Sequence, residues 1–141
     1  MVDPILIEPY QDAFLPALRN LYLKSRKASF IWLDTAGYEL SDFDSDVEGE
    51  QIWVAIIGED IAGFISIWEP ENFIHHLYVS PEHIRKGVGC HLMQLAKARY
   101  SALSLKCMSH NEPALQFYQS QGFTRQSKAE DSLGEYYLLT L

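Results

Sequence analysis

The residues most suited to binding or catalysis form a short glycine-containing segment at positions 84–89, Ile-Arg-Lys-Gly-Val-Gly. An apolar run precedes it and a helical pattern of apolar residues follows, so it joins a strand to a helix. Glycine lets backbone N–H groups approach an anion closely, and a helix N-terminus favours negative charge. The segment lacks the third glycine of a dinucleotide fingerprint and the Gly-Lys-Ser/Thr of a P-loop. It therefore indicates a turn that holds a pyrophosphate through its backbone, although a plain tight turn fits the spacing equally well.

A second segment places Asn111, Ala114 and Tyr118 on one face of a predicted helix. A tyrosine in this place can donate its phenolic proton to a leaving group. The same spacing also fits an amphipathic helix that buries Leu115, Phe117 and Tyr118 in the core. Spacing alone favours the packing interpretation.

Charge is distributed unevenly along the 141 residues. Residues 1–27 have a net charge of +1 and residues 85–141 of +3, whereas residues 28–84 contain twelve acidic side chains and no Lys or Arg, which gives −8 overall. General nucleic-acid binding needs a basic footprint, which this distribution does not provide. We therefore expect no nucleic-acid partner.

The N-terminal sequence and the cysteines limit the protein classes further. The first eight residues lack the basic and apolar regions of a signal peptide, and the longest nearly apolar run, Ile61–Trp68, is much shorter than a membrane span. Cys90 and Cys107 do not suggest a disulfide scaffold, and no metal-ligand spacing occurs. We expect a soluble, cytoplasmic protein with no membrane partner and no metal site.

The elements that position these segments indicate a single α/β domain over residues 1–141. The expected order is a strand, two helices, three strands, a helix, a strand, a helix and two strands, which favours a mixed sheet. Asn111 is expected to cap the last helix and Gly122 to end it. The expected strands are 2–8, 51–57, 61–68, 73–79, 103–107, 123–126 and 136–141, and the expected helices are 10–24, 41–47, 88–99 and 111–121.

Together the two segments resemble the GNAT superfamily of acetyl-CoA-dependent N-acetyltransferases. The family's cofactor loop, Q/R-x-x-G-x-G/A, is matched at 84–89 except that Ile84 stands at the Gln or Arg position. The end of the preceding strand, Leu77-Tyr78-Val79 followed by Pro81, is also similar, so the resemblance covers about residues 73–123. The family's later motif, N-x-x-A-x-x-F-Y-x-x-x-G-F, is matched throughout, by Asn111, Ala114, Phe117, Tyr118, Gly122 and Phe123.

The resemblance implies a single-domain GNAT-like mixed sheet whose fourth and fifth strands splay apart. Acetyl-CoA would bind between them as cosubstrate, with its pantetheine arm along the fourth strand and its pyrophosphate on the loop amides. Ile84 would make no polar contact there, and Arg85 would supply the charge instead. The cofactor-binding residues implied in this way are Leu77, Tyr78, Val79, Arg85, Lys86, Gly87, Val88, Gly89, Cys90 and Asn111.

The activity implied is direct transfer of acetyl from the thioester to a primary amine in a ternary complex. Tyr118 would protonate the departing thiolate, and a backbone N–H near Val79 would polarise the thioester carbonyl. Cys90, in the first turn of its predicted helix, is a conceivable nucleophile for a ping-pong route. A small packed residue is the simpler interpretation of that cysteine, because the family pattern does not use it.

His75 is the first choice for the base that deprotonates the amine. Histidine titrates near neutral pH, and some family members, such as serotonin N-acetyltransferase, carry a histidine at the matching place. His76 is expected to point to the opposite face of the sheet. Glu69, Glu71 and a water relay are alternative bases, and a purely structural role for His75 stays open.

The acidic stretch 28–84 overlaps the part of the chain where the family places acceptor specificity. Acidic side chains with interleaved aromatics suit a cationic amine; the aromatics are Phe30, Trp32, Tyr38 and Phe43. We expect a small-molecule or peptide amine acceptor, such as a polyamine, an aminoglycoside-like amine or a lysine side chain, although a solvated acidic face explains the charge equally well. The alternative function is a noncatalytic acetyl-CoA-binding module on the same fold, and the sequence is compatible with a homodimer.

Overall fold

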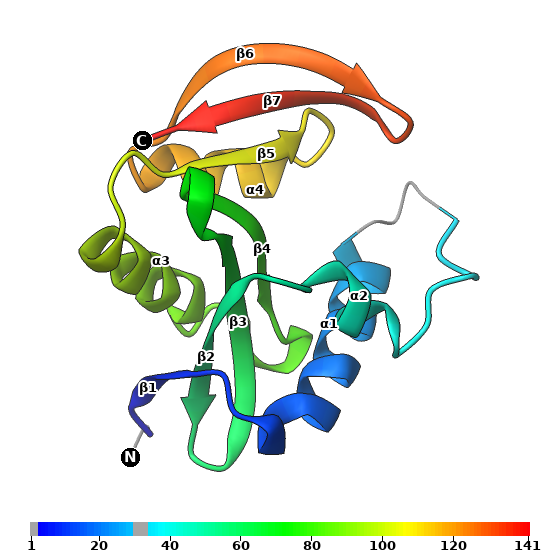
Figure 1. The fold of residues 1–141 in the computed structure, drawn as a ribbon, viewed down its shortest axis with the longest axis vertical. Helices are drawn as coiled ribbons and strands as arrows, with labels where there is room; N and C mark the ends of the chain where they lie inside the picture. Colours follow the sequence, from blue (N-terminus) through cyan, green and yellow to red (C-terminus); the bar gives the residue numbers. More distant parts are fainter. Residues whose placement is uncertain (1–2, 30–33) are drawn as a thin grey trace.

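A computed structural model describes residues 3–29 and 34–141, and its framework is a sheet with the strand order β1-β2-β3-β4-β5-β7-β6 (Figure 1). β4 and β5 run parallel, and the other neighbours run antiparallel. The predicted order of elements is confirmed. The strands are β1 (Ile5–Pro9), β2 (Gln51–Ile57), β3 (Asp60–Trp68), β4 (Phe73–Val79), β5 (Ser104–Met108), β6 (Thr124–Asp131) and β7 (Gly134–Thr140), and the helices are α1 (Leu15–Ser29), α2 (Asp42–Asp46), α3 (Val88–Arg99) and α4 (Glu112–Ser120).

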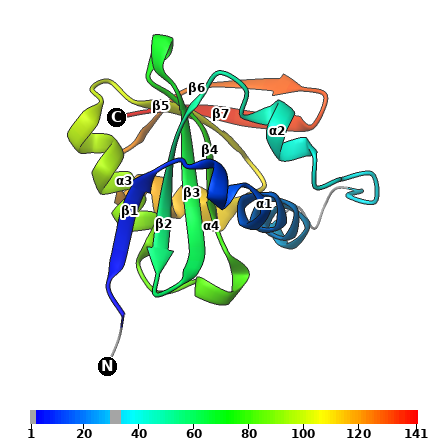
Figure 2. The same ribbon diagram turned by 60° about the horizontal axis from the view of Figure 1, so that its bottom comes forward.

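Helices cover both faces of the sheet, and β2 shows how its side chains divide between them (Figure 2). Ile52 and Val54 pack with residues of α1 and α2, whereas Trp53 and Ala55 pack with residues of α3 and α4. This division follows from the two-residue period of a strand. Burial on both faces explains why β2 and β3 are almost continuously apolar in sequence.

Gly63 in β3 allows α3 to approach the sheet closely. A Cβ at this position would lie 2.8 Å from the Tyr78 carbonyl oxygen and 2.9 Å from Val88 Cγ1, which is closer than a side chain tolerates. The glycine therefore lets the first residue of α3 lie directly on β3 and β4. This contact fixes where the N-terminus of α3 stands relative to the end of β4.

β4 and β5 separate soon after they begin. They pair at Phe73 with Ser104 and at Ile74 with Leu105, and no further pairing between them is formed in the described part of the chain. Figure 1 shows the two strands running in different directions beyond this point. The predicted splaying of the fourth and fifth strands is confirmed.

Two predicted elements differ from the structure. The chain before Leu15 forms a short 3-10 turn, Asp12–Phe14, instead of helix, and α1 continues to Ser29. The first strand of the final hairpin, β6, is longer than predicted. The prediction ended it too early because every residue of β6 is exposed, so its sequence lacks the apolar alternation that marks a strand. In residues 3–29 and 34–141, none of the helices has the length and apolar character needed to cross a bilayer.

Candidate functional site

The loop between β4 and α3 presents a helix N-terminus. The Ser80 N–H donates to the Ala62 carbonyl at 2.8 Å, which ends the pairing of β4 with β3. Gly87 caps α3 at φ +85°, a left-handed conformation that glycine adopts without steric cost, and Arg85 takes a similar φ of +63°. The His91 N–H donates to Gly87 at 3.0 Å as the first bond of the helix. The amides ahead of His91 therefore point out of the helix end.

The residues just before this helix end are exposed to solvent, and two of them are positively charged. Arg85 and Lys86 are exposed, and so is Ile84, which departs from the motif, at 56%. A Cβ on Gly89 would lie 3.3 Å from Phe117 Cζ, so this glycine lets α4 pack against the start of α3. An exposed helix N-terminus with two adjacent cations suits a pyrophosphate.

The end of β4 turns backbone groups toward the side from which β5 has departed. The bond from Ser80 to Ala62 places Tyr78 and His76 of β4 in the hydrogen-bonded positions opposite β3. In an antiparallel ladder the intervening residues face the other way, so the backbone of Leu77 and Val79 faces the open side. The Val79 carbonyl accepts a hydrogen bond from Ser25 Oγ of α1 at 3.3 Å. This geometry fits the pantetheine contacts that the motif implies.

Tyr118 lies on α4, with ring centroids 5.4 Å from Phe117 and 5.8 Å from Phe123. Burial raises the pKa of its phenol well above the ordinary value, and negative charge on Cys107 or Tyr78 would raise the pKa further. The phenol therefore keeps its proton at neutral pH. Tyr118 packs against the core cluster that contains Cys107 of β5, and Leu77 and Val79 of β4 pack against the same cluster.

Asn111 and Cys90 occupy the predicted helix positions. The Asn111 Oδ1 accepts a hydrogen bond from the Ala114 N–H at 3.4 Å, which confirms the predicted cap of α4. Cys90 is exposed in the first turn of α3, and the Gln121 Nε2 group donates to its Sγ at 3.5 Å. The capping bond occupies Oδ1 of Asn111, so its side-chain N–H groups are the part that could meet a cosubstrate.

His75 and His76 both face the carboxylate of Glu50. Glu50 Oε2 forms a short hydrogen bond with His75 Nδ1, and Glu50 Oε1 lies 3.6 Å from His76 Nδ1. The two imidazole centroids are 3.9 Å apart. His76 Nδ1 also lies 2.8 Å from Ser66 Oγ, and its Nε2 lies 3.3 Å from the Tyr22 hydroxyl.

The prediction that His76 points away from His75 is wrong, because β4 contains a bulge. Ser66 pairs with His76 and Ile67 pairs with Ile74, so His75 is an extra residue without a partner on β3. A bulge breaks the alternation of side chains between the two faces of a strand. The two adjacent histidines consequently meet at one carboxylate.

Burial and polar contacts have opposing effects on the charges in this cluster. Burial works to raise the pKa of Glu50, but its contacts with His76, Ser66 and His75 outweigh burial and leave the pKa below the ordinary value. Burial lowers the pKa of His76, although Glu50 partly offsets the effect. The cluster therefore combines an ionised Glu50 with a neutral His76 at neutral pH.

Glu50 is the functional candidate that sequence reasoning missed. It lies 25 positions from His75 and just before β2, and the bulge that unites it with both histidines depends on strand register. The donor atoms of Glu50, His75 and His76 lie within 4.8 Å of one another. This spacing is compatible with a divalent cation. The same atoms, however, already lie against one another or against Ser66. The expectation of no metal site stays a prediction.

The acidic stretch is much less free than its sequence indicates. Arg19 Nε donates to Asp44 at 2.9 Å, and Arg26 Nη2 donates to Asp42 at 3.2 Å. Both arginines come from α1 and their partners from α2. Among the described residues, six of the twelve acidic side chains lie within 4.0 Å of a basic or histidine side chain, namely Asp42, Asp44, Asp46, Glu50, Asp60 and Glu82.

The proposed aromatic acceptor surface also needs correction. Phe43 is 1% exposed and belongs to the core between α2 and the sheet, so it cannot contact an acceptor. Tyr38 stacks on the Arg26 guanidinium, which lies 4.2 Å from its ring centroid. Phe30 and Trp32 lie outside the described residues.

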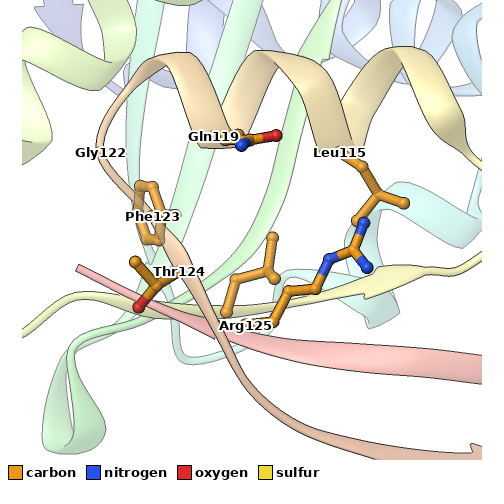
Figure 3. A pocket seen from close by; sticks show the side chains of 7 residues that line it. Leu115, Gln119, Gly122, Phe123, Thr124 and Arg125 are labelled. Carbon is orange, nitrogen blue, oxygen red and sulfur yellow. The ribbon is translucent and has the colours of Figure 1, made fainter.

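A separate pocket of about 550 Å³ lies between α4 and the β6–β7 hairpin. Figure 3 shows Arg125 of β6 extending toward Leu115 of α4 across this pocket. A smaller space of about 180 Å³ lies beside α1 and is lined in part by Lys24 and His83. None of the predicted site residues lines either space, so neither belongs to the predicted site.

The sequence comparison decides the family. A profile described as "Acetyltransferase (GNAT) family" matches residues 15–123. This chain is a member of the GNAT family. The matched region runs from α1 to the end of the Asn111–Phe123 motif and therefore contains the loop, the bulge and Tyr118.

One sequence relative and two solved structures are similar to this chain. Peptidyl-lysine N-acetyltransferase YiaC from Escherichia coli K12 is 34% identical over 125 residues, which cover 84% of this chain and 82% of YiaC. The solution structure of apo YjaB from E. coli has a TM-score of 0.78 at 22% identity and covers 97% of each chain. The PaiA N-acetyltransferase from Thermoplasma acidophilum, solved with coenzyme A, has a TM-score of 0.75 at 18% identity and covers 96% of this chain and 98% of that one.

Proposed function

We propose that this GNAT chain transfers acetyl from acetyl-CoA to a primary amine, and that a lysine side chain in a peptide is its acceptor. The observation that carries the proposal is the opening between β4 and β5 beside the N-terminus of α3. Tyr118 packs on the core cluster to which both of these strands contribute. Family membership and a fold neighbour solved with coenzyme A support the same cosubstrate.

The residues present fit acetyl-CoA. The amides of Val88, Gly89 and Cys90 at the start of α3 would receive the pyrophosphate, with Arg85 and Lys86 adding positive charge. The pantetheine amides would pair with the exposed backbone of β4, and acetyl-CoA would supply the acetyl group as a thioester. Ile84 adds no polar contact, so the backbone and Arg85 carry recognition at the loop.

His75 and Tyr118 divide the proton transfers. The acceptor ammonium gives one proton to His75, and the neutral nitrogen then forms a bond to the carbonyl carbon while the C–S bond breaks. The nitrogen loses its second proton to solvent water as the amide forms, and Tyr118 gives its phenolic proton to the departing thiolate. Both side chains return to their starting states through water, so one proton is released per acetyl transferred.

A peptidyl-lysine acceptor rests on the relative that carries this activity in its name. YiaC shares 34% identity over most of both chains. The half-exposed His75 side chain is accessible at the point where β4 leaves β5, as an incoming amine requires. The exposed carboxylates that have no basic partner among the described residues would favour a cationic peptide.

The test is acetyl-CoA binding followed by turnover with lysine peptides, polyamines, aminoglycosides and amino acids. We expect acetyl-CoA to raise the melting temperature, and we expect a lysine peptide to release free thiol. Charge reversal of Arg85 and Lys86 should weaken acetyl-CoA binding without affecting the melting temperature of the free protein. A raised melting temperature with no thiol release from any amine would favour the noncatalytic binding module instead.

A further inference from the structure

The feature that the reaction scheme leaves unexplained is the buried carboxylate of Glu50. Its side chain is only 6% exposed, yet Oε1 has no hydrogen-bond partner in the described part of the chain. A buried carboxylate oxygen without a partner destabilises the folded protein. The presence of Glu50 at this position therefore points to a functional role for its side chain. Oε2 is engaged by His75 Nδ1, and Oε1 faces His76 Nδ1 at 3.6 Å.

The proton positions around His76 follow from its neighbours. Burial raises the pKa of Tyr22, so Tyr22 keeps its proton and donates it to Asp46 Oδ2 at 2.6 Å. The hydrogen in the contact between Tyr22 and His76 Nε2 must then come from the imidazole. Neutral His76 therefore carries its proton on Nε2, and its Nδ1 accepts from the Ser66 hydroxyl.

Glu50 is ionised at neutral pH and can only accept hydrogen bonds. The hydrogen in its bond with His75 therefore belongs to His75 Nδ1. A neutral imidazole protonated at Nδ1 has its lone pair on Nε2. Since Nδ1 is turned to a buried carboxylate while the His75 side chain is 46% exposed, the Nε2 edge is the part that solvent and an amine can reach.

We propose that Glu50 is a positioning residue that holds His75 in the Nδ1–H tautomer, directs the Nε2 lone pair toward the acceptor amine and stabilises the imidazolium formed when the amine's proton arrives. This inference rests on the proposed N-acetyltransferase function. His76 forms the wall of the site and takes no proton from the substrate. The bulge in β4 is the structural device that brings His75 and His76 together at Glu50.

The surrounding charged and titratable groups support this division of roles. From α1, Tyr22 and Arg26 face the cluster, with Arg26 Nη1 4.0 Å from Asp46 of α2. From β4, the Tyr78 ring centroid lies 6.1 Å from that of His76. Asp46 is thus shared between Tyr22 and Arg26, and Glu50 is the carboxylate that directly contacts His75.

The first test reads the tautomers directly. Two-bond proton–nitrogen correlation spectra of the 15N-labelled protein should show His75 protonated at Nδ1 and His76 at Nε2. Glu50→Gln retains an acceptor oxygen and should keep the His75 tautomer, whereas Glu50→Ala should lose it. A wild-type His75 protonated at Nε2 would overturn the inference, and this readout needs no acceptor.

The second test measures turnover in a double-mutant cycle. Glu50→Gln should lower kcat/KM about 10- to 100-fold through kcat, with acceptor KM unchanged. In a His75→Gln background the same change should have no effect. The matched control is Glu48→Gln, an exposed carboxylate two positions earlier, which should match wild type.

The outcomes separate the inference from the function on which it rests. Equal losses from Glu50→Gln with and without His75 would mean that Glu50 acts through something other than His75, which contradicts the inference alone. The expected tautomers with no acetylation of any amine would overturn the proposed function and, with it, the role of Glu50. Melting temperatures of all variants identify losses that come only from unfolding.

Discussion

Replacing Arg26 with methionine is expected to destabilise the protein far more than the same change at Arg19. Arg26 is only 6% exposed, and its guanidinium lies 4.0 Å from the ring centroid of Tyr22 and 4.2 Å from that of Tyr38. Methionine keeps most of the apolar stem but loses both cation–π contacts, each worth about 1 kcal/mol in a largely desolvated position. The free energy of unfolding should therefore fall by about 2 kcal/mol. Asp42 also loses its ion-pair partner, which adds to this fall.

Arg19 provides a control from the same helix with the same chemistry. It also pairs with an aspartate of α2, but its side chain is exposed, and exposed ion pairs contribute little. For a domain of this size about 2 kcal/mol corresponds to a fall of roughly 8 °C in melting temperature. Urea unfolding and thermal melts at neutral pH measure both variants. Equal stabilities for Arg26→Met and Arg19→Met would refute the conclusion that α2 is held by a buried cation.

Three further predictions concern the site and its surroundings. Tyr118→Phe keeps the aromatic packing, so the melting temperature should hold while kcat falls about 100-fold or more; an unaltered kcat would remove the general-acid role. Burial raises the pKa of Cys107 to about 11. Iodoacetamide should therefore label Cys90 at least ~100 times faster than Cys107 in the native protein, as measured by peptide mass spectrometry. Comparable labelling of the two cysteines would contradict the buried position of Cys107. Because the pKa of His76 is lowered from 6.5, the unfolded chain takes up that proton first, and stability should fall as pH drops below about 6.5. The lowered pKa of Glu50 adds a further loss below about 4.5; urea midpoints that stay constant from pH 7.5 to pH 4 would disprove both contributions.

Local sequence was sufficient for the parts of the site that are built from consecutive residues. The glycines at 87 and 89 and the cap at Asn111 determine backbone conformation within a few positions, so the loop and α4 could be predicted. The separation of β4 and β5 followed from the family resemblance. The structure has both features where they were expected.

Features that depend on pairing between distant segments could not be predicted. The bulge at His75 arises from the register between β3 and β4, and nothing in the sequence of β4 marks it. The partnership of Glu50 with His75 and the pairing of Arg26 with Asp42 join positions 25 and 16 residues apart. For the same reason, counting charges along the chain overstated the free negative charge, because residues of α1 neutralise those of α2.

Detection of the acetylated product tests the central claim most directly. The protein would be incubated with acetyl-CoA that carries an isotopically labelled acetyl group and with a lysine-containing peptide, and the peptide would then be sequenced by mass spectrometry. The account predicts labelled acetyl on the lysine side-chain nitrogen, coenzyme A released in equal amount, and a large loss of both in Tyr118→Phe and His75→Gln. Saturable binding of acetyl-CoA with no labelled amine, in the peptide or in polyamine, aminoglycoside and amino-acid acceptors, would contradict it.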